Sequence, residues 1–171
     1  CFGKDTAAVL ALGNTYDYDL QLVRSAIDVN RRQRLFVVDK LQQHLKVLRG
    51  TTIGLLGLAF KGNTDDLRDS PSLEIISLLR DRGARVVAFD PSGPAADDDR
   101  LADIEVVEDP YAATAGADVL AVLTEWDEFK WLDFDKVAEA MVAPRVVDGR
   151  NLLDRSSLIR RGFAYDGIGR S

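Results

Sequence analysis

The amino-acid sequence predicts an α/β protein in which a long N-terminal helix precedes a doubly wound, mostly parallel sheet. Two observations predict this fold class. From Asp17 to about Leu48 there is no proline and no glycine, which permits one long helix. From Thr51 onward, short apolar runs alternate with helical segments. Such strand–helix alternation is typical of parallel sheets that carry helices on both faces.

The apolar residues of the predicted long helix recur at spacings of three and four positions, apart from a gap in the middle. This period places them on one stripe of the helix, and Asn30 and Arg34 fall on the same stripe inside the gap. A helix of this length extends about 45 Å, which is more than one small domain can cover. We therefore expect the stripe to be buried against another domain or subunit. Its members are Leu20, Val23, Ile27, Val38, Leu41, Leu45 and Leu48.

The region after residue 50 contains six short runs rich in apolar and β-branched residues. Several are continuously apolar, which is typical of strands buried on both faces. Between them, Ser70 and Pro71 suit the N-cap and first position of a helix, and Gly83 suits its end. We therefore expect two parts, residues 1–49 and residues 50–171. The predicted strands lie in "TTIGLLG", "ARVVAFD", "IEVVED", "ADVLAVLT", "PRVVDG" and "FAYDGIG", and the predicted helices in "PSLEIISLLRDRG", "DPYAATAG", "DFDKVAEAM", "DRSSLIRRG" and a piece near Asp97–Ala102.

The composition of the 171 residues argues against several functional classes. A net charge of −6 disfavours broad binding to nucleic acid or to membrane surfaces. No apolar run approaches the roughly 18 residues that a membrane span needs, and the N-terminus does not resemble a signal peptide. The one cysteine, Cys1, cannot form an internal disulfide, which favours a reducing cytoplasm. With His44 as the one histidine, we expect no tetrahedral zinc site.

A charged loop, "GLAFKGNTDDLRDSP" at Gly57–Pro71, follows the first predicted strand. Ligands of doubly wound sheets bind beyond the carboxyl ends of the strands, and the N-terminus of the following helix favours phosphate. Lys61 offers a point charge and Arg68 a planar donor fork. The loop has neither the G-x-G-x-x-G spacing nor the P-loop order of glycine and lysine. The alternative is a solvated loop in which Arg68 pairs with Asp65 or Asp66.

Two further polar residues follow predicted strands. Arg150, in "VVDGRNLLD", comes after a later strand and is expected at the same sheet edge as Lys61. Taken alone it reads as a surface arginine in a turn, but two cations arriving at one edge favour a diphosphate pocket. Asp90 ends "VVAFD", where dinucleotide sites place an acid for the ribose. Because no glycine fingerprint precedes it, we expect a cap or turn role instead.

Several segments together resemble the UDP-glucose/GDP-mannose dehydrogenase family. They are "CFGKD", the pair Val29–Asn30, "GLAFKGNTDDLRDSP", "DGRN" and "GFAYDGIGR", and they follow the family's order from Cys1 to Arg170. "TEWDEFK" and "DGRN" are most similar to members that act on UDP-glucose, with GDP-mannose and UDP-N-acetylmannosamine as alternative substrates. The resemblance implies a catalytic-cysteine segment and a central dimerisation helix in residues 1–49. It implies a Rossmann-like UDP-sugar-binding domain in residues 50–171.

The resemblance also implies the residues of the reaction and of the cofactor site. Cys1 matches the nucleophile, and Asp5 matches an acid that assists at the catalytic centre. Lys4 lies in the segment that approaches the nicotinamide of NAD, and Arg68 matches a residue that reaches the cofactor at a domain interface. In such enzymes two hydrides pass from the C6 alcohol to NAD. The cysteine thiolate forms a thiohemiacetal and then a thioester that water hydrolyses.

The resemblance implies three substrate contacts and three partners. Phe60 and Lys61 match the pair at the nucleotide sugar, and Arg150 matches a UDP-sugar contact. The expected partners are a UDP-sugar substrate, a second copy of the chain bound through the long helix, and an NAD-binding domain that precedes Cys1. Without that domain, the chain is not expected to turn over.

Two other function classes stay open on the residues alone. An amide hydrolase with Cys1 as N-terminal nucleophile would explain a cysteine at residue 1, but it requires antiparallel sandwich sheets. A non-catalytic nucleotide-sugar-binding or dimerisation module would keep the Lys61 site without the chemistry.

Overall fold

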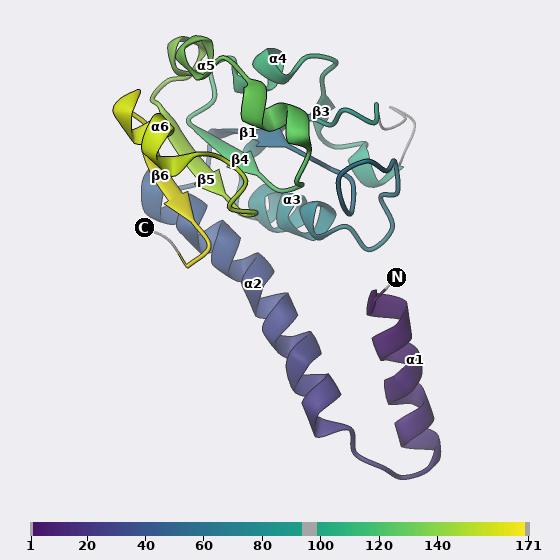
Figure 1. Cartoon of the computed structure of the whole chain (residues 1–171). Coiled ribbons are helices and arrows are strands. Elements are labelled where there is room, and N and C mark those ends of the chain that lie inside the picture. Colours follow the sequence, from purple (N-terminus) through teal and green to yellow (C-terminus); the bar gives the residue numbers. More distant parts are fainter. Residues whose placement is uncertain (1, 94–98, 170–171) are drawn as a thin grey trace. The chain divides into compact units, whose positions relative to one another are not determined.

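Six parallel strands form one sheet in the order β3-β2-β1-β4-β5-β6 (Figure 1). The computed structural model describes residues 2–93 and 99–169. All six predicted strands are present, and the predicted fold class is confirmed. The all-parallel pairing contradicts the antiparallel sandwich that an N-terminal-nucleophile hydrolase requires. The strands are β1 (Thr52–Leu56), β2 (Arg85–Phe89), β3 (Glu105–Val106), β4 (Val119–Val122), β5 (Arg145–Asp148) and β6 (Ala164–Gly167).

The helices of the sheet region lie where the alternating pattern predicts them. Ser70 caps the longest of these helices by accepting a hydrogen bond from the backbone N–H of Ser72, and Pro71 is its first residue. The short helix η2 was not predicted. The helices are α3 (Pro71–Asp81), η1 (Asp99–Leu101), α4 (Pro110–Thr114), η2 (Asp127–Trp131), α5 (Phe134–Ala140) and α6 (Arg155–Arg160).

The long helix predicted between Asp17 and Leu48 is present as α2 (Gln21–Leu45), and a further helix that was not predicted, α1 (Phe2–Thr15), precedes it. The chain reverses between them at Asp17, which has a φ of 52°. Arg24 fixes this turn, because its guanidinium donates to Asp19 and to Asn14. The alanine- and leucine-rich segment before the turn favours helix, but Gly3 and Gly13 leave it outside the glycine-free run that predicts α2.

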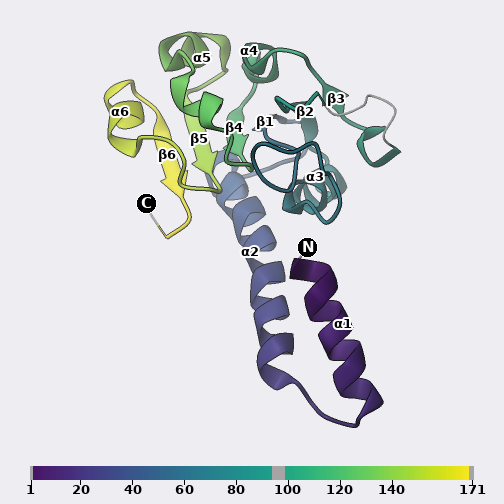
Figure 2. The same ribbon diagram turned by 45° about the vertical axis from the view of Figure 1, so that its right-hand side comes forward.

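The chain divides into two compact units, one that ends at Phe36 and one that begins at Val37. In the second unit, alternate strand residues face opposite sides of the sheet, and helices cover both faces (Figure 2). One face carries α3 and the last turns of α2, with Val38 and Leu41 fully buried. The other face carries α4, α5 and α6. Gly54 of β1 permits close packing there, since a Cβ atom would lie 2.4 Å from the carbonyl oxygen of Ala113 in α4.

The apolar stripe of α2 is therefore used in two ways. Its C-terminal members contribute to the core of the second unit, as the pattern predicts for packing against a domain. In the first unit, its members Val23 and Ile27 are half-buried, whereas Leu22 and Val29, which lie outside the stripe, are largely exposed. No helix among residues 2–93 and 99–169 combines the length and the apolar character that crossing a membrane requires.

A buried charged cluster joins the end of α2 to β6. The ammonium of Lys40 donates to Asp166 at 2.6 Å, and both side chains are largely buried. The Nε2 atom of His44 lies 3.9 Å from the other oxygen of Asp166, and no described residue forms a hydrogen bond with this nitrogen. Burial lowers the pKa of His44 below its usual 6.5. Asp166 opposes this effect, and Arg145 and Lys40 reinforce it.

We expect the second unit to lose stability when the pH falls below about 6.5. The unfolded chain takes up a proton on His44 more readily than the folded chain, so protonation favours unfolding. The urea midpoint should be lower at pH 5.5 than at pH 7.5, and His44→Gln should reduce that difference. Because the sequence contains one histidine, no other side chain has its ordinary pKa in this window. An unchanged difference in His44→Gln would contradict the assignment.

Candidate functional site

The candidate site lies at the carboxyl edge of the sheet, where β1 and β4 are neighbours and the chain winds in opposite directions. Ligands of doubly wound folds bind at this switch point. Two loops meet here. One runs from Gly57 to Ser70 after β1, and the other runs from Leu123 to Trp126 after β4. The sequence predicted the first loop as a site and did not single out the second as one.

The two loops are in direct backbone contact. Gly57 has a φ of +97°, and a Cβ atom at this position would lie 2.4 Å from the Cβ of Thr124. A Cβ atom on Gly62 would lie 2.3 Å from the carbonyl oxygen of Glu125. Both positions therefore require glycine. The two loops are thus packed tightly against each other at the switch point.

Asp90, at the end of β2, fixes the start of the first loop. Its side chain is only 2% exposed. One carboxylate oxygen accepts hydrogen bonds from the backbone N–H groups of Leu58 and Ala59, at 2.6 and 2.9 Å, and from Nε1 of Trp126. The other accepts from the backbone and the hydroxyl of Ser92. Asp90 thus has the predicted turn role, and its oxygens are already used by the protein.

Two hydroxyl groups bind the carbonyl groups of the same loop. Ser70 donates to the carbonyl of Leu58 at 2.6 Å, and Thr124 donates to the carbonyl of Ala59 at 2.7 Å. Farther along, the backbone N–H of Phe60 donates to the carbonyl of Asp66. The chain around Phe60 and Lys61 is therefore held on a rigid support rather than on a free loop.

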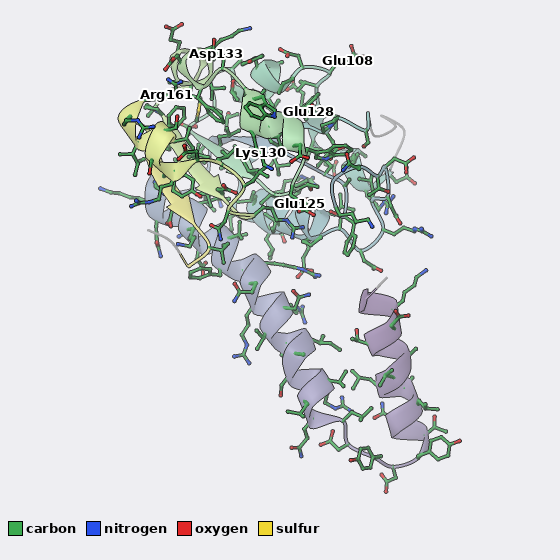
Figure 3. The ribbon with its side chains drawn as sticks, viewed as in Figure 1. Glu108, Glu125, Glu128, Lys130, Asp133 and Arg161 are labelled. Carbon is green, nitrogen blue, oxygen red and sulfur yellow. The ribbon has the colours of Figure 1, made fainter. Side chains whose placement is uncertain are left out.

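Arg150 extends from the end of β5 across the carboxyl edge. Its Nε donates to the carbonyl of Leu123 at 2.7 Å, and its Nη2 lies 3.5 Å from the carbonyl of Phe60. Nε also lies 3.1 Å from the carboxylate of Glu125, which is labelled in Figure 3. Among the described residues, no acceptor lies on Nη1. The guanidinium thus touches both loops and keeps one amino group available to a ligand.

Lys61 and Arg150 come to the same edge, as predicted. The Nη2 of Arg150 contacts the residue that precedes Lys61. The side chain of Lys61 is exposed, and its ammonium has no partner in the part of the chain that the structure describes. Two cations at this edge, beside the N-terminus of α3, form a site suited to a phosphate-bearing ligand.

Arg68 is engaged within its own loop. Its guanidinium donates to both oxygens of Asp66, at 2.9 and 2.8 Å, and its backbone N–H donates to the same carboxylate. The side-chain hydrogen bonds and then the backbone hydrogen bond hold the pKa of Asp66 well below its usual value. The solvated pairing weighed for this loop is the arrangement observed. A role of Arg68 toward a cofactor stays a prediction.

The predicted catalytic segment belongs to the first unit. Cys1 lies outside the described residues, whereas Lys4 and Asp5 are exposed on α1. The sheet edge belongs to the second unit. The roles of Cys1, Lys4 and Asp5 stay predictions.

The sheet edge does not fit a dinucleotide cofactor. The loop after β1 lacks the G-x-G-x-x-G fingerprint, and the oxygens of Asp90 accept from the protein instead of a ribose. Groups of three or more potential metal ligands do not occur among residues 2–93 and 99–169.

Sequence reasoning missed the residues that support the site. Thr124 ends a predicted strand, Glu125 directly follows it, and Asp148 lies next to the end of another, so their places at strand ends were available as a signal. Their contacts were not, because these depend on which strands become neighbours. Asp148 is fully buried and accepts hydrogen bonds from the turn that carries Arg150.

Residues 54–155 match the family model described as "UDP-glucose/GDP-mannose dehydrogenase family, UDP binding domain". The matched range contains the whole candidate site. The chain is also similar to a UDP-glucose 6-dehydrogenase of Rhizobium meliloti (strain 1021), with 39% identity over 171 residues. A UDP-glucose 6-dehydrogenase of Haloferax volcanii is 38% identical over 170 residues.

Solved structures show the same similarity. A UDP-glucose dehydrogenase from Pyrobaculum islandicum superposes with a TM-score of 0.81 at 32% identity and covers 100% of this chain. A UDP-D-ManNAc dehydrogenase from Pyrococcus horikoshii superposes with a TM-score of 0.76 at 27% identity and covers 92%. The chain spans 39% of the Rhizobium relative and 37% of the Pyrobaculum structure.

Proposed function

The chain belongs to the UDP-glucose/GDP-mannose dehydrogenase family, and we propose that it is the C-terminal part of a cytoplasmic, NAD-dependent UDP-glucose 6-dehydrogenase. In this proposal, the whole protein oxidises the C6 alcohol of UDP-glucose to the acid of UDP-glucuronate. The second unit binds the UDP part of the substrate. The observation that carries the proposal is the contact between Arg150 and the Phe60–Lys61 backbone at the carboxyl edge.

The two cations of this edge suit the diphosphate of a nucleotide sugar. Arg150 is anchored by two backbone carbonyls and retains Nη1 for a phosphate oxygen. Lys61 adds an exposed positive charge that no described residue pairs. Charge-assisted hydrogen bonds of this kind are stronger than neutral ones. The carbonyl of Phe60, the residue before Lys61, is one of the two groups that anchor Arg150. We propose that Phe60 also contacts the nucleotide sugar.

Catalysis would be carried out by the N-terminal segment. We propose that the thiolate of Cys1 adds to the C6 aldehyde, giving a thiohemiacetal, and that water hydrolyses the thioester formed at the next oxidation. Asp5 would assist at this centre. When bound, NAD accepts hydride. Because the sheet edge of this chain does not fit a dinucleotide, we propose that NAD binds to a preceding domain, with Lys4 and Arg68 reaching toward it.

We propose that the protein forms a homodimer through the long helix. The first unit exposes large apolar side chains on α1 and α2, including Leu12, Leu22 and Val29, which are 59%, 88% and 54% exposed. A surface of this kind gains stability when it is covered.

Calorimetric titration tests the binding site directly. UDP and UDP-glucose should both bind, and Lys61→Ala should weaken binding about tenfold, because it removes one charge-assisted contact. Arg161→Ala is a matched control. Arg161 lies between α6 and β6, on the side of the sheet where β6 begins, and it pairs with Asp135 of α5. A parallel titration with GDP tests the alternative that the site binds a GDP-sugar. Absence of heat with UDP and UDP-glucose would reject the assignment of this edge.

The 171-residue chain alone should produce no NADH from UDP-glucose, whereas the whole protein should. The physical reason is that this sheet edge does not fit NAD. Absorbance at the NADH band measures the reaction. Turnover by the chain alone would show that the cofactor site has been wrongly placed.

A further inference from the structure

The backbone turn after β5 determines where the side chain of Arg150 points. Its guanidinium reaches two carbonyls, one after β4 and one after β1. A small rotation of the turn would move the tip of this long side chain away from both carbonyls. The groups that fix the turn therefore determine where the free Nη1 points.

Asp148 fixes the start of this turn from inside the protein. One carboxylate oxygen accepts a hydrogen bond from the backbone N–H of Arg150 at 3.0 Å. The other accepts from the N–H of Leu153 at 2.8 Å and from the hydroxyl of Tyr165 at 3.2 Å. Asp148 is fully buried, so these bonds are shielded from water. Tyr165 supplies this hydroxyl from the neighbouring strand, β6.

Asn151 fixes the other side of the turn. It has a φ of 54°, in the left-handed region that a side chain other than glycine rarely adopts. Its amide nitrogen donates to the carbonyl of Ile168 at 2.9 Å, and its amide oxygen accepts from the N–H of the same residue at 3.1 Å. A glycine would adopt this backbone freely. The asparagine adds a two-point attachment to the segment after β6.

The end of β6 is shaped to accept both groups. A Cβ atom on Gly167 would lie 2.4 Å from the amide oxygen of Asn151 and 3.0 Å from the hydroxyl of Tyr165. Glycine at this position allows both side chains to approach. On its other side, Asp166 is bound by Lys40 of α2. The segment 165–168 is thus a fixed support behind the Arg150 turn.

We propose that Asn151 and Tyr165 are positioning residues that direct Arg150 toward the diphosphate of the ligand. This inference rests on the proposed function, because it takes Arg150 as a ligand contact. Asn151 and Tyr165 act through the turn and not by touching the ligand. The segment after β6 is then part of the binding apparatus, although it lies behind the ligand-facing edge.

A double-mutant cycle in the whole protein tests the proposal, with calorimetric affinity for UDP as the readout. Asn151→Gly keeps the left-handed backbone and removes the two-point attachment, and we expect about tenfold weaker binding. Tyr165→Phe removes only the hydroxyl, and we expect about threefold weaker binding. In an Arg150→Ala background, each substitution should have no further effect on UDP affinity, because the side chain that it directs is gone.

Controls separate positioning from general damage. Lys46→Gly also replaces a left-handed residue, with a φ of 63° at the end of α2, and should leave UDP affinity unchanged. The proposal would be overturned if the losses in UDP affinity added to that of Arg150→Ala. It would also be overturned if neither Asn151→Gly nor Tyr165→Phe reduced UDP affinity. If Asn151→Gly does not fold, Tyr165→Phe alone completes the cycle. If Arg150→Ala itself leaves UDP affinity intact, the proposed function of this edge fails instead.

Discussion

Replacing Asp90 with alanine should lower the free energy of unfolding by about 3 to 5 kcal/mol, as expected for a buried hydrogen-bond network that loses its acceptor. The carboxylate accepts five hydrogen bonds, from Leu58, Ala59, Trp126 and, twice, Ser92. In the variant, the backbone N–H groups of Leu58 and Ala59 would stay buried without an acceptor. Urea unfolding followed by circular dichroism measures the loss.

Two variants make the Asp90 experiment specific. In Asp90→Asn the side chain keeps nearly the same shape, but one carboxylate oxygen becomes an NH₂ group. This NH₂ group faces donors, either those of Leu58, Ala59 and Trp126 or those of Ser92, so the variant should also be clearly destabilised. Asp103→Ala removes an exposed acid that pairs with Arg80, and it should cost less than about 1 kcal/mol. If Asp90→Ala were no more harmful than Asp103→Ala, the bonds to Asp90 would not be what stabilises the loop.

The order of helices and strands after residue 50 could be predicted because each segment carries its own local signal. The apolar runs mark the strands, and Ser70 with Pro71 marks the start of α3. These signals involve only residues that are close together in the chain, so they can be recognised in the sequence. Helix α1 was not predicted because the prediction depended on the absence of glycine, and Gly13 lies within that helix.

The site was only partly predictable because its contacts join residues that are far apart in the chain. Lys61 and Arg150 could be assigned to one edge, since both follow strands of a parallel sheet. The pairing of Thr124 with Ala59, or of Asn151 with Ile168, depends on the strand order, which local patterns do not encode. Arg68 illustrates the opposite case. Its partner Asp66 is two residues away, and the sequence already offered that pairing.

The second large effect concerns the shape of the Arg150 side chain rather than its charge. Arg150→Lys should weaken UDP binding about 10- to 100-fold, even though the net charge is unchanged. The guanidinium of Arg150 uses separate nitrogens for the carbonyl of Leu123 and the carbonyl of Phe60, and it retains Nη1. A lysine ammonium is a single point on a flexible stem, so it cannot occupy these positions together.

Calorimetry at two salt concentrations separates geometry from charge. Because the charge is retained, the salt dependence of UDP binding should be similar in Arg150→Lys and in the unsubstituted protein, while the affinity differs at both concentrations. Arg160→Lys, an exposed change on α6, is the matched control and should bind UDP normally. If Arg150→Lys bound UDP as tightly as the unsubstituted protein, Arg150 would act only as a diffuse positive charge. The two carbonyl contacts would then be irrelevant to binding, because any cation at this edge would serve equally well.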